Sequence, residues 1–152
     1  EFTERYRVHY MAIDPELQPF DGIEELLKKL SAGPVPTAVA TGKSRSGLNR
    51  VLEAMNWRHH FVSTRCADEG ISKPHPWMLN DLMAEIGVDP AATLMIGDTT
   101  HDLGMARAAG VRAIGVTYGA HPGELLATEP AIALVDTVAE LVGALDQAMK
   151  SG

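Results

Sequence analysis

The sequence predicts an α/β fold in which a doubly wound parallel sheet is covered by helices on both faces. Its short apolar runs are continuous rather than alternating, which is typical of strands buried on both sides. Segments with helical periodicity separate these runs, and such alternation indicates βαβ units. The length of 152 residues and the apolar content of 45% suit one compact domain.

Five longer helices are expected, because apolar residues recur three or four positions apart in five segments. Asp21 and Ser44 are suited to cap helix starts, and Gly87 and Gly110 to end helices. The expected ranges are 21–30, 45–55, 77–86, 100–109 and 137–149, with a shorter helix near Glu124.

Five strands are expected between these helices, at residues 35–41, 61–63, 93–96, 113–116 and 132–135. The run 61–63 is the weakest of them. Folds of this class bind ligands at the carboxyl ends of their strands. The residues that follow the strands are therefore the first candidates for a functional site.

The N-terminal segment predicts a different element. Phe2, Tyr6 and Tyr10 recur at spacings of four, which indicates the last turns of an amphipathic helix from Glu1 to about Met11. Prolines and a glycine between residues 14 and 22 then favour a loop.

The composition argues against several classes of function. Thirteen Lys and Arg against 20 Asp and Glu give a net charge of −7, which disfavours binding to a nucleic-acid backbone. No apolar run approaches the roughly 20 residues that span a bilayer. The single cysteine, Cys66, predicts a reduced thiol in a cytoplasmic protein. We expect neither nucleic acid nor membrane as a partner, and a homodimer stays open.

Two carboxylates follow the run 93–96 at a strand-to-helix turn. Asp98 and Asp102 are four residues apart, and Gly97 gives the backbone room to bend, so both side chains can face one point. Such a pair suits Mg²⁺, which takes one or two carboxylates together with water and phosphate oxygens. The same residues also suit a helix start, with Asp98 or Thr99 as the cap and Asp102 in the first turn. The pair alone does not separate these two interpretations.

Two other segments supply groups that bind phosphate. Thr41 ends an apolar run, and its hydroxyl with the backbone N–H groups of Gly42 and Lys43 forms an anion site at the start of the next helix. Lys73 precedes Pro74, which keeps the lysine backbone extended. Its ammonium is then a fixed positive charge for a phosphate or a developing oxyanion. Each residue also has a plainer role, as a helix cap for Thr41 and as a solvated side chain for Lys73.

Together these segments resemble the motifs of the haloacid dehalogenase-like hydrolases, within the phosphoglycolate phosphatase-like branch that carries a helical cap. The matching segments are Val39–Lys43 for the second motif, Ser72–Pro76 for the third and Met95–Asp102 for the fourth. Ala106–Val111 is typical of the helix that follows. The resemblance extends from about Pro19 to the C-terminus and implies a Rossmann-like core.

The resemblance implies hydrolysis of a phosphate ester through a covalent aspartyl-phosphate, with Mg²⁺ as cofactor. Thr41 and Gly42 would bind the phosphoryl group, and Lys73 would neutralise charge on it and on the nucleophile. Asp98 would be a metal ligand. Asp102 would be either a second metal ligand or an outer carboxylate that orients Lys73. The expected substrate is a small phosphorylated metabolite, with phosphoglycolate as the first choice.

The first motif of the family, an apolar strand that ends in Asp-x-Asp-Gly-Thr, is absent from the sequence. Asp14-Pro15-Glu16 has no strand predicted before it. In the family this strand lies between those that end at Thr41 and at Gly97, and each buried backbone group left unpaired by its loss costs about 1–3 kcal/mol. We expect residues 1–18 to be a remnant of the cap with a linker, residues 19–152 to be a core without its first strand, and the nucleophile to lie outside this chain.

Other functions remain open at this point. A sugar-phosphate mutase, a nucleotidase or a pyrophosphatase of the same family could use the same core, because the cap usually selects the substrate. A non-catalytic module that binds phosphate or a partner chain is a further alternative, since the nucleophile is missing. Turnover of p-nitrophenyl phosphate in the presence of Mg²⁺ separates an enzyme from such a module.

Overall fold

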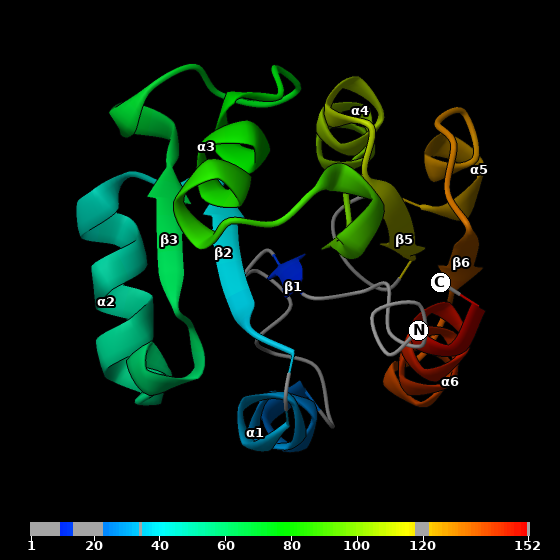
Figure 1. Ribbon diagram of the computed structural model, residues 1–152, viewed down its shortest axis with the longest axis horizontal. Helices are drawn as coiled ribbons and strands as arrows, with labels where there is room; N and C mark the ends of the chain where they lie inside the picture. The colour runs from blue at the N-terminus through cyan, green and yellow to red at the C-terminus, as the bar shows by residue number, and fades with distance from the viewer. Residues whose placement is uncertain (1–9, 14–22, 34, 118–121, 152) are drawn as a thin grey trace.

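The computed structural model describes residues 10–13, 23–33, 35–117 and 122–151, and in them a six-stranded sheet lies between two layers of helices (Figure 1). The strand order is β3-β2-β1-β4-β5-β6, and every neighbouring pair is parallel. The predicted doubly wound α/β fold is confirmed. None of the helices in these ranges has both the length and the apolar character that a membrane crossing requires.

The strands are short, as is usual for this class. They are β1 (Tyr10–Ile13), β2 (Thr37–Thr41), β3 (Ser63–Cys66), β4 (Thr93–Gly97), β5 (Arg112–Val116) and β6 (Ala133–Val135). The α-helices are α1 (Ile23–Ala32), α2 (Arg45–Met55), α3 (Trp77–Ile86), α4 (Thr100–Ala109), α5 (Gly123–Leu126) and α6 (Val138–Ser151). The described residues also contain three 3₁₀ turns, η3 (Arg58–His60), η4 (Ala67–Glu69) and η5 (Pro90–Ala92), of which η4 follows β3.

Two hydrophobic cores hold the layers together. The first lies between the sheet and helices α1, α2 and α6, and the second between the sheet and helices α3, α4 and α5 (Figure 1). Successive strand residues point to opposite faces, so Val39 and Ile96 belong to the first core while Ala38 and Met95 belong to the second. Burial on both faces explains why the central strands are continuous apolar runs.

Local signals set several helix ends as predicted. The Ser44 side chain accepts a hydrogen bond from the N–H of Gly47 at 3.1 Å and caps α2. Gly110 ends α4 with a φ of 74°, a left-handed conformation that residues with a Cβ rarely adopt. The expected cap Asp21 lies outside the described residues.

The weakest predicted strand is shifted along the chain. Residues 61–63 were expected, whereas β3 spans Ser63–Cys66. β3 is an edge strand and carries the polar residues Thr64 and Arg65, so the apolar pattern did not identify it.

The helix expected up to about Met11 is wrong at its carboxyl end. Tyr10–Ile13 form strand β1, which lies in the centre of the sheet and pairs with both β2 and β4. The central position that we expected to be empty is therefore occupied, and Asp14 directly follows a strand. The physical reason is that β2 and β4 would otherwise each carry a row of buried backbone groups without partners. Residues 1–9 and 14–22 lie outside the described ranges, so the domain division at residue 18 stays a prediction.

Candidate functional site

The predicted site residues lie at the carboxyl edge of the sheet. Thr41 is the last residue of β2 and Gly97 is the last residue of β4, and these strands flank β1. Strands that are second neighbours lie about 9.6 Å apart. β1 ends at Ile13, which pairs with Val39 and Ile96, so both flanking strands extend beyond it. The ends of β2 and β4 therefore lie on either side of the end of β1.

Lys73 and Asp102 form a buried ion pair at this edge. The Nζ of Lys73 donates a hydrogen bond to Oδ1 of Asp102, and the two side chains are 7% and 0% exposed. Charges with so little contact with water are tolerated when they neutralise each other. The pair joins the loop before α3 to the first turn of α4, and it fixes the ammonium group of Lys73 at the site.

The second carboxylate oxygen of Asp102 builds the start of α4. Its Oδ2 accepts the backbone N–H groups of Asp98 at 3.1 Å and Thr99 at 3.2 Å. The Thr99 hydroxyl in turn accepts the N–H of Asp102 at 3.1 Å, which completes a capping box. The helix-cap interpretation is confirmed for Thr99 and Asp102, and Thr99 rather than Asp98 is the cap. Because protein groups engage both oxygens of Asp102, the geometry favours the role of orienting Lys73 over that of a metal ligand.

Asp98 supplies the carboxylate that suits a metal. It is the first residue after β4 and is 2% exposed. Among the described residues no group of three or more His, Cys, Asp or Glu side chains is arranged to hold a metal ion. Mg²⁺ needs only one or two carboxylates and completes its coordination with water and phosphate oxygens, so Asp98 fits this ion.

The Thr41 loop differs in one detail from the predicted anion site. Thr41 is fully buried, and its Oγ1 accepts the N–H of Lys43 at 3.1 Å, so this N–H is used within the loop. A hydroxyl that accepts one hydrogen bond can still donate its own proton. A Cβ atom built on Gly42 would meet no other described group within 4 Å, so the loop has space on that side.

Sequence reasoning missed Arg45 and its two acidic partners. The backbone N–H of Arg45 donates to both carboxylate oxygens of Asp68, at 3.0 and 3.2 Å. Its guanidinium group forms a two-point contact with Glu69, with both distances 3.0 Å. These partners lie 23 and 24 positions away, so no local pattern reveals them. The adjacent carboxylates of Asp68 and Glu69, a few residues after the expected strand 61–63, were the one available signal.

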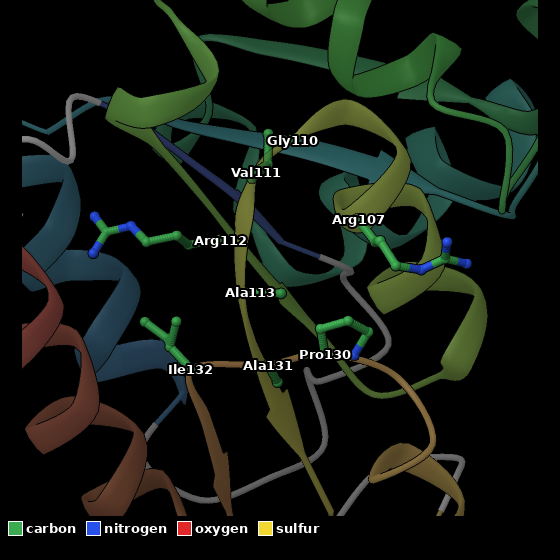
Figure 2. A pocket seen from close by; sticks show the side chains of 8 residues that line it. All are labelled: Arg107, Gly110, Val111, Arg112, Ala113, Pro130, Ala131 and Ile132. Carbon is green, nitrogen blue, oxygen red and sulfur yellow. The ribbon is translucent and has the colours of Figure 1, made fainter.

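A separate pocket of about 300 Å³ lies at the opposite end of the sheet (Figure 2). The end of α4, the start of β5 and the segment before β6 line it. Arg107 and Arg112 extend in different directions from it, and Arg107 pairs with Glu129 at 2.9 Å. None of the predicted site residues lines this pocket, so it is distinct from the candidate site.

Comparison with known proteins agrees with the motif pattern. The model of the haloacid dehalogenase-like hydrolase family matches residues 1–116. The chain is 43% identical over 133 residues to the probable phosphatase IndB of Dickeya dadantii, covering 86% of this chain and 57% of that protein. It is 32% identical over 150 residues to the phosphoglycolate phosphatase of Agrobacterium fabrum, covering 97% of this chain and 64% of that protein.

Solved structures share the fold. A crystal structure of a predicted phosphoglycolate phosphatase from Haemophilus somnus superposes with a TM-score of 0.77 and 26% identity, covering 83% of this chain and 56% of that one. The chain thus spans less than two thirds of the length of each of these three proteins.

Proposed function

Because the chain belongs to the haloacid dehalogenase-like hydrolase family, we propose that it forms the core of a Mg²⁺-dependent phosphatase for a small phosphorylated metabolite. The observation that carries this proposal is the position of Thr41 on one side of β1 and of the Lys73–Asp102 pair with Asp98 on the other. A hydroxyl donor, a fixed cation and a buried carboxylate at one edge of the sheet are the kinds of group that bind and stabilise a phosphoryl group. Phosphoryl transfer depends mainly on such positioning and charge stabilisation.

Each residue has a defined role in this proposal. The Thr41 hydroxyl donates a hydrogen bond to a phosphoryl oxygen. The Lys73 ammonium, held by Asp102, neutralises charge on the phosphoryl group as it is transferred. Asp98 would hold Mg²⁺, which when bound supplies further positive charge to the phosphoryl oxygens. Asp102 holds Lys73 and the start of α4 in place.

The attacking carboxylate is proposed to lie outside this chain, because the sequence contains no Asp-x-Asp-Gly-Thr string. That carboxylate would attack phosphorus, and the bond from phosphorus to the alcohol oxygen would break as the alcohol takes up a proton. Water would then hydrolyse the aspartyl-phosphate and release inorganic phosphate. Asp14 follows β1 and must be tested as a competing source of the nucleophile.

The proposed substrate is a small phosphate monoester, with phosphoglycolate as the first candidate. Relatives in Agrobacterium fabrum and Haemophilus somnus carry that name, which supports the choice. The acidic net charge of −7 supports a metabolite over a nucleic acid. We further propose a cytoplasmic location, which the lone buried cysteine supports.

Hydrolysis of p-nitrophenyl phosphate with Mg²⁺ tests the proposal. Two forms are compared, namely this chain and the same chain extended by the residues encoded upstream of Glu1. We expect the extended form to release nitrophenol, and Asp98→Asn to lower its rate by about 100-fold or more. This chain alone should bind inorganic phosphate without turnover.

Three results would contradict parts of the proposal. Turnover by this chain alone that disappears in Asp14→Asn would show that the chain supplies its own nucleophile. An Asp98→Asn variant with full activity would overturn the metal role. Failure of both forms to bind phosphate would favour a module that binds a partner chain.

A further inference from the structure

The side chain of Arg45 bridges the two loops of the candidate site. Arg45 begins α2, four residues after Thr41, and its partner Glu69 lies four residues before Lys73. We propose that Arg45 is a positioning residue that fixes the distance between the Thr41 hydroxyl and the Lys73 ammonium. This inference rests on the proposed function, because it assigns Arg45 a part in binding the phosphoryl group.

The guanidinium group of Arg45 makes four hydrogen bonds to two residues. Nε and Nη2 donate to the two oxygens of Glu69, each at 3.0 Å. Nη1 donates to the hydroxyl of Thr64 at 2.7 Å, and Nη2 donates to its backbone carbonyl at 3.2 Å. Only a planar guanidinium offers donors in this fixed arrangement, so a lysine would keep the charge and lose the geometry.

Backbone contacts beside this side chain tie the loops together a second time. The N–H of Ala67 donates to the carbonyl of Lys43 at 3.0 Å, and the N–H of Arg45 donates to the carboxylate of Asp68. Glu69 also accepts the N–H of Cys66 at 2.8 Å, through the same oxygen that Arg45 Nη2 contacts. The segment after Thr41 is thus bonded to η4 at Lys43 and again at the backbone of Arg45.

The segment from Glu69 to Trp77 transmits this restraint to Lys73. Glu69 is held by Arg45, and the next residue, Gly70, lies so close to the Trp77 ring that an added Cβ would come within 2.7 Å of it. Lys73 is held in turn by Asp102. The contact of Glu69 with Arg45 is therefore one anchor at the amino-terminal end of this short segment, beside the bond from the Arg45 N–H to Asp68.

Arg65 provides a matched control. It lies on β3, and like Arg45 it contacts carboxylates, with Asp81 and Glu85 each at 2.7 Å. Its partners belong to α3, on the other face of the sheet from α2, and they do not lie in the segment that carries Lys73. Loss of Arg65 removes a comparable set of ion pairs without releasing either site loop.

The test compares Arg45→Met, Arg45→Lys and Arg65→Met in this chain, with inorganic phosphate and Mg²⁺ as the probe. Calorimetric titration should show the dissociation constant for phosphate raised about tenfold in Arg45→Met, since small displacements of binding groups are costly. Arg45→Lys should fail to restore binding, and Arg65→Met should stay within about twofold of the parent chain. Thermal unfolding of each variant separates loss of fold from loss of position.

Two further measurements test whether Arg45 acts through its contact with Glu69. Amide hydrogen exchange at Ala67 should accelerate in Arg45→Met and not in Arg65→Met, with or without phosphate. Arg45→Met combined with Glu69→Gln should bind phosphate as weakly as Arg45→Met alone, because both changes break one contact. Unchanged phosphate binding by a folded Arg45→Met variant would overturn the role of Arg45 and leave the proposed function standing. Absence of phosphate binding by the parent chain would overturn the proposed function and this role with it.

Discussion

Gly97 lies directly against the side chain of Asp102: a Cβ atom built on Gly97 would fall 2.2 Å from the Cβ and 2.6 Å from the Cγ of Asp102. Any side chain at position 97 must therefore displace the carboxylate that holds Lys73 and caps α4. The requirement for glycine here comes from this close approach, since the position has no left-handed φ.

Gly97→Ala should weaken the site and the fold together. The added methyl group pushes Asp102 away from Lys73, and such overpacking costs about 1–3 kcal/mol of stability. We expect a lower midpoint of urea unfolding and weaker binding of inorganic phosphate.

Gly143→Ala is the matched control for this change. Gly143 is exposed in α6, and its added Cβ would contact nothing among the described groups within 4 Å. Because alanine favours helix over glycine, we expect a gain of about 1 kcal/mol without any effect on phosphate binding. Equal destabilisation by both substitutions would contradict the steric explanation.

Lys73→Met should be among the most destabilising changes at the site. It leaves the buried charge of Asp102 without its cation, and breaking a buried pair in this way costs about 3–5 kcal/mol. Denaturant unfolding at neutral pH measures the loss. Adding Asp102→Asn to Lys73→Met should recover part of the stability, because the isolated charge is then removed. A double variant that is less stable than Lys73→Met would count against this account.

Acid should weaken the contact between Arg45 and Glu69. The hydrogen bond from Arg45 holds the pKa of Glu69 below its ordinary value of 4.5. A lowered carboxyl pKa contributes stability that is fully present above the unfolded value and is lost as the pH falls through the lowered folded value. The stability advantage of the parent chain over Glu69→Gln should therefore shrink as the pH is lowered below 4.5. An advantage that is constant down to acid unfolding would show that Glu69 makes no charged contact.

Cys66 should be unreactive in the folded protein. Its side chain is fully buried, and this burial raises the pKa of the thiol above its ordinary value of 9.0. A raised pKa contributes stability that is present below the unfolded value and is lost as the pH rises above it. Because the folded protein buries the thiol, iodoacetamide near pH 8 should label Cys66 in urea and not in buffer without urea. Similar labelling rates in both would contradict the burial.

Much of the architecture could be read from local patterns. Ser44 and Gly110 mark helix ends through interactions within one turn, so the sequence shows them directly. The buried central strands appear as continuous apolar runs for the same reason, since burial on two faces leaves no polar alternation. Thr41 ends β2 and Asp98 follows β4, while Lys73 precedes α3. The parallel sheet brings the carboxyl ends of β2 and β4 to one edge.

The sequence predictions that were wrong concern segments whose structure depends on contacts with distant parts of the chain. Tyr10 fits a helical spacing with two residues before it, yet the four-residue segment that it begins pairs with two central strands. A segment that short carries too few positions for its own periodicity to decide its structure. The predicted position of β3 was wrong for a related reason, because an edge strand does not need an apolar pattern.

The sequence by itself determined the parallel α/β class, the helix ends and the set of candidate site residues, because these depend on local propensity and on the order of the elements. The tertiary structure alone decided that one oxygen of Asp102 holds Lys73 while the other caps α4. It alone revealed Arg45 beside Glu69, 24 positions away. Hydrogen bonds and ion pairs need atoms within about 3 Å, and only the folded chain brings such distant residues so close.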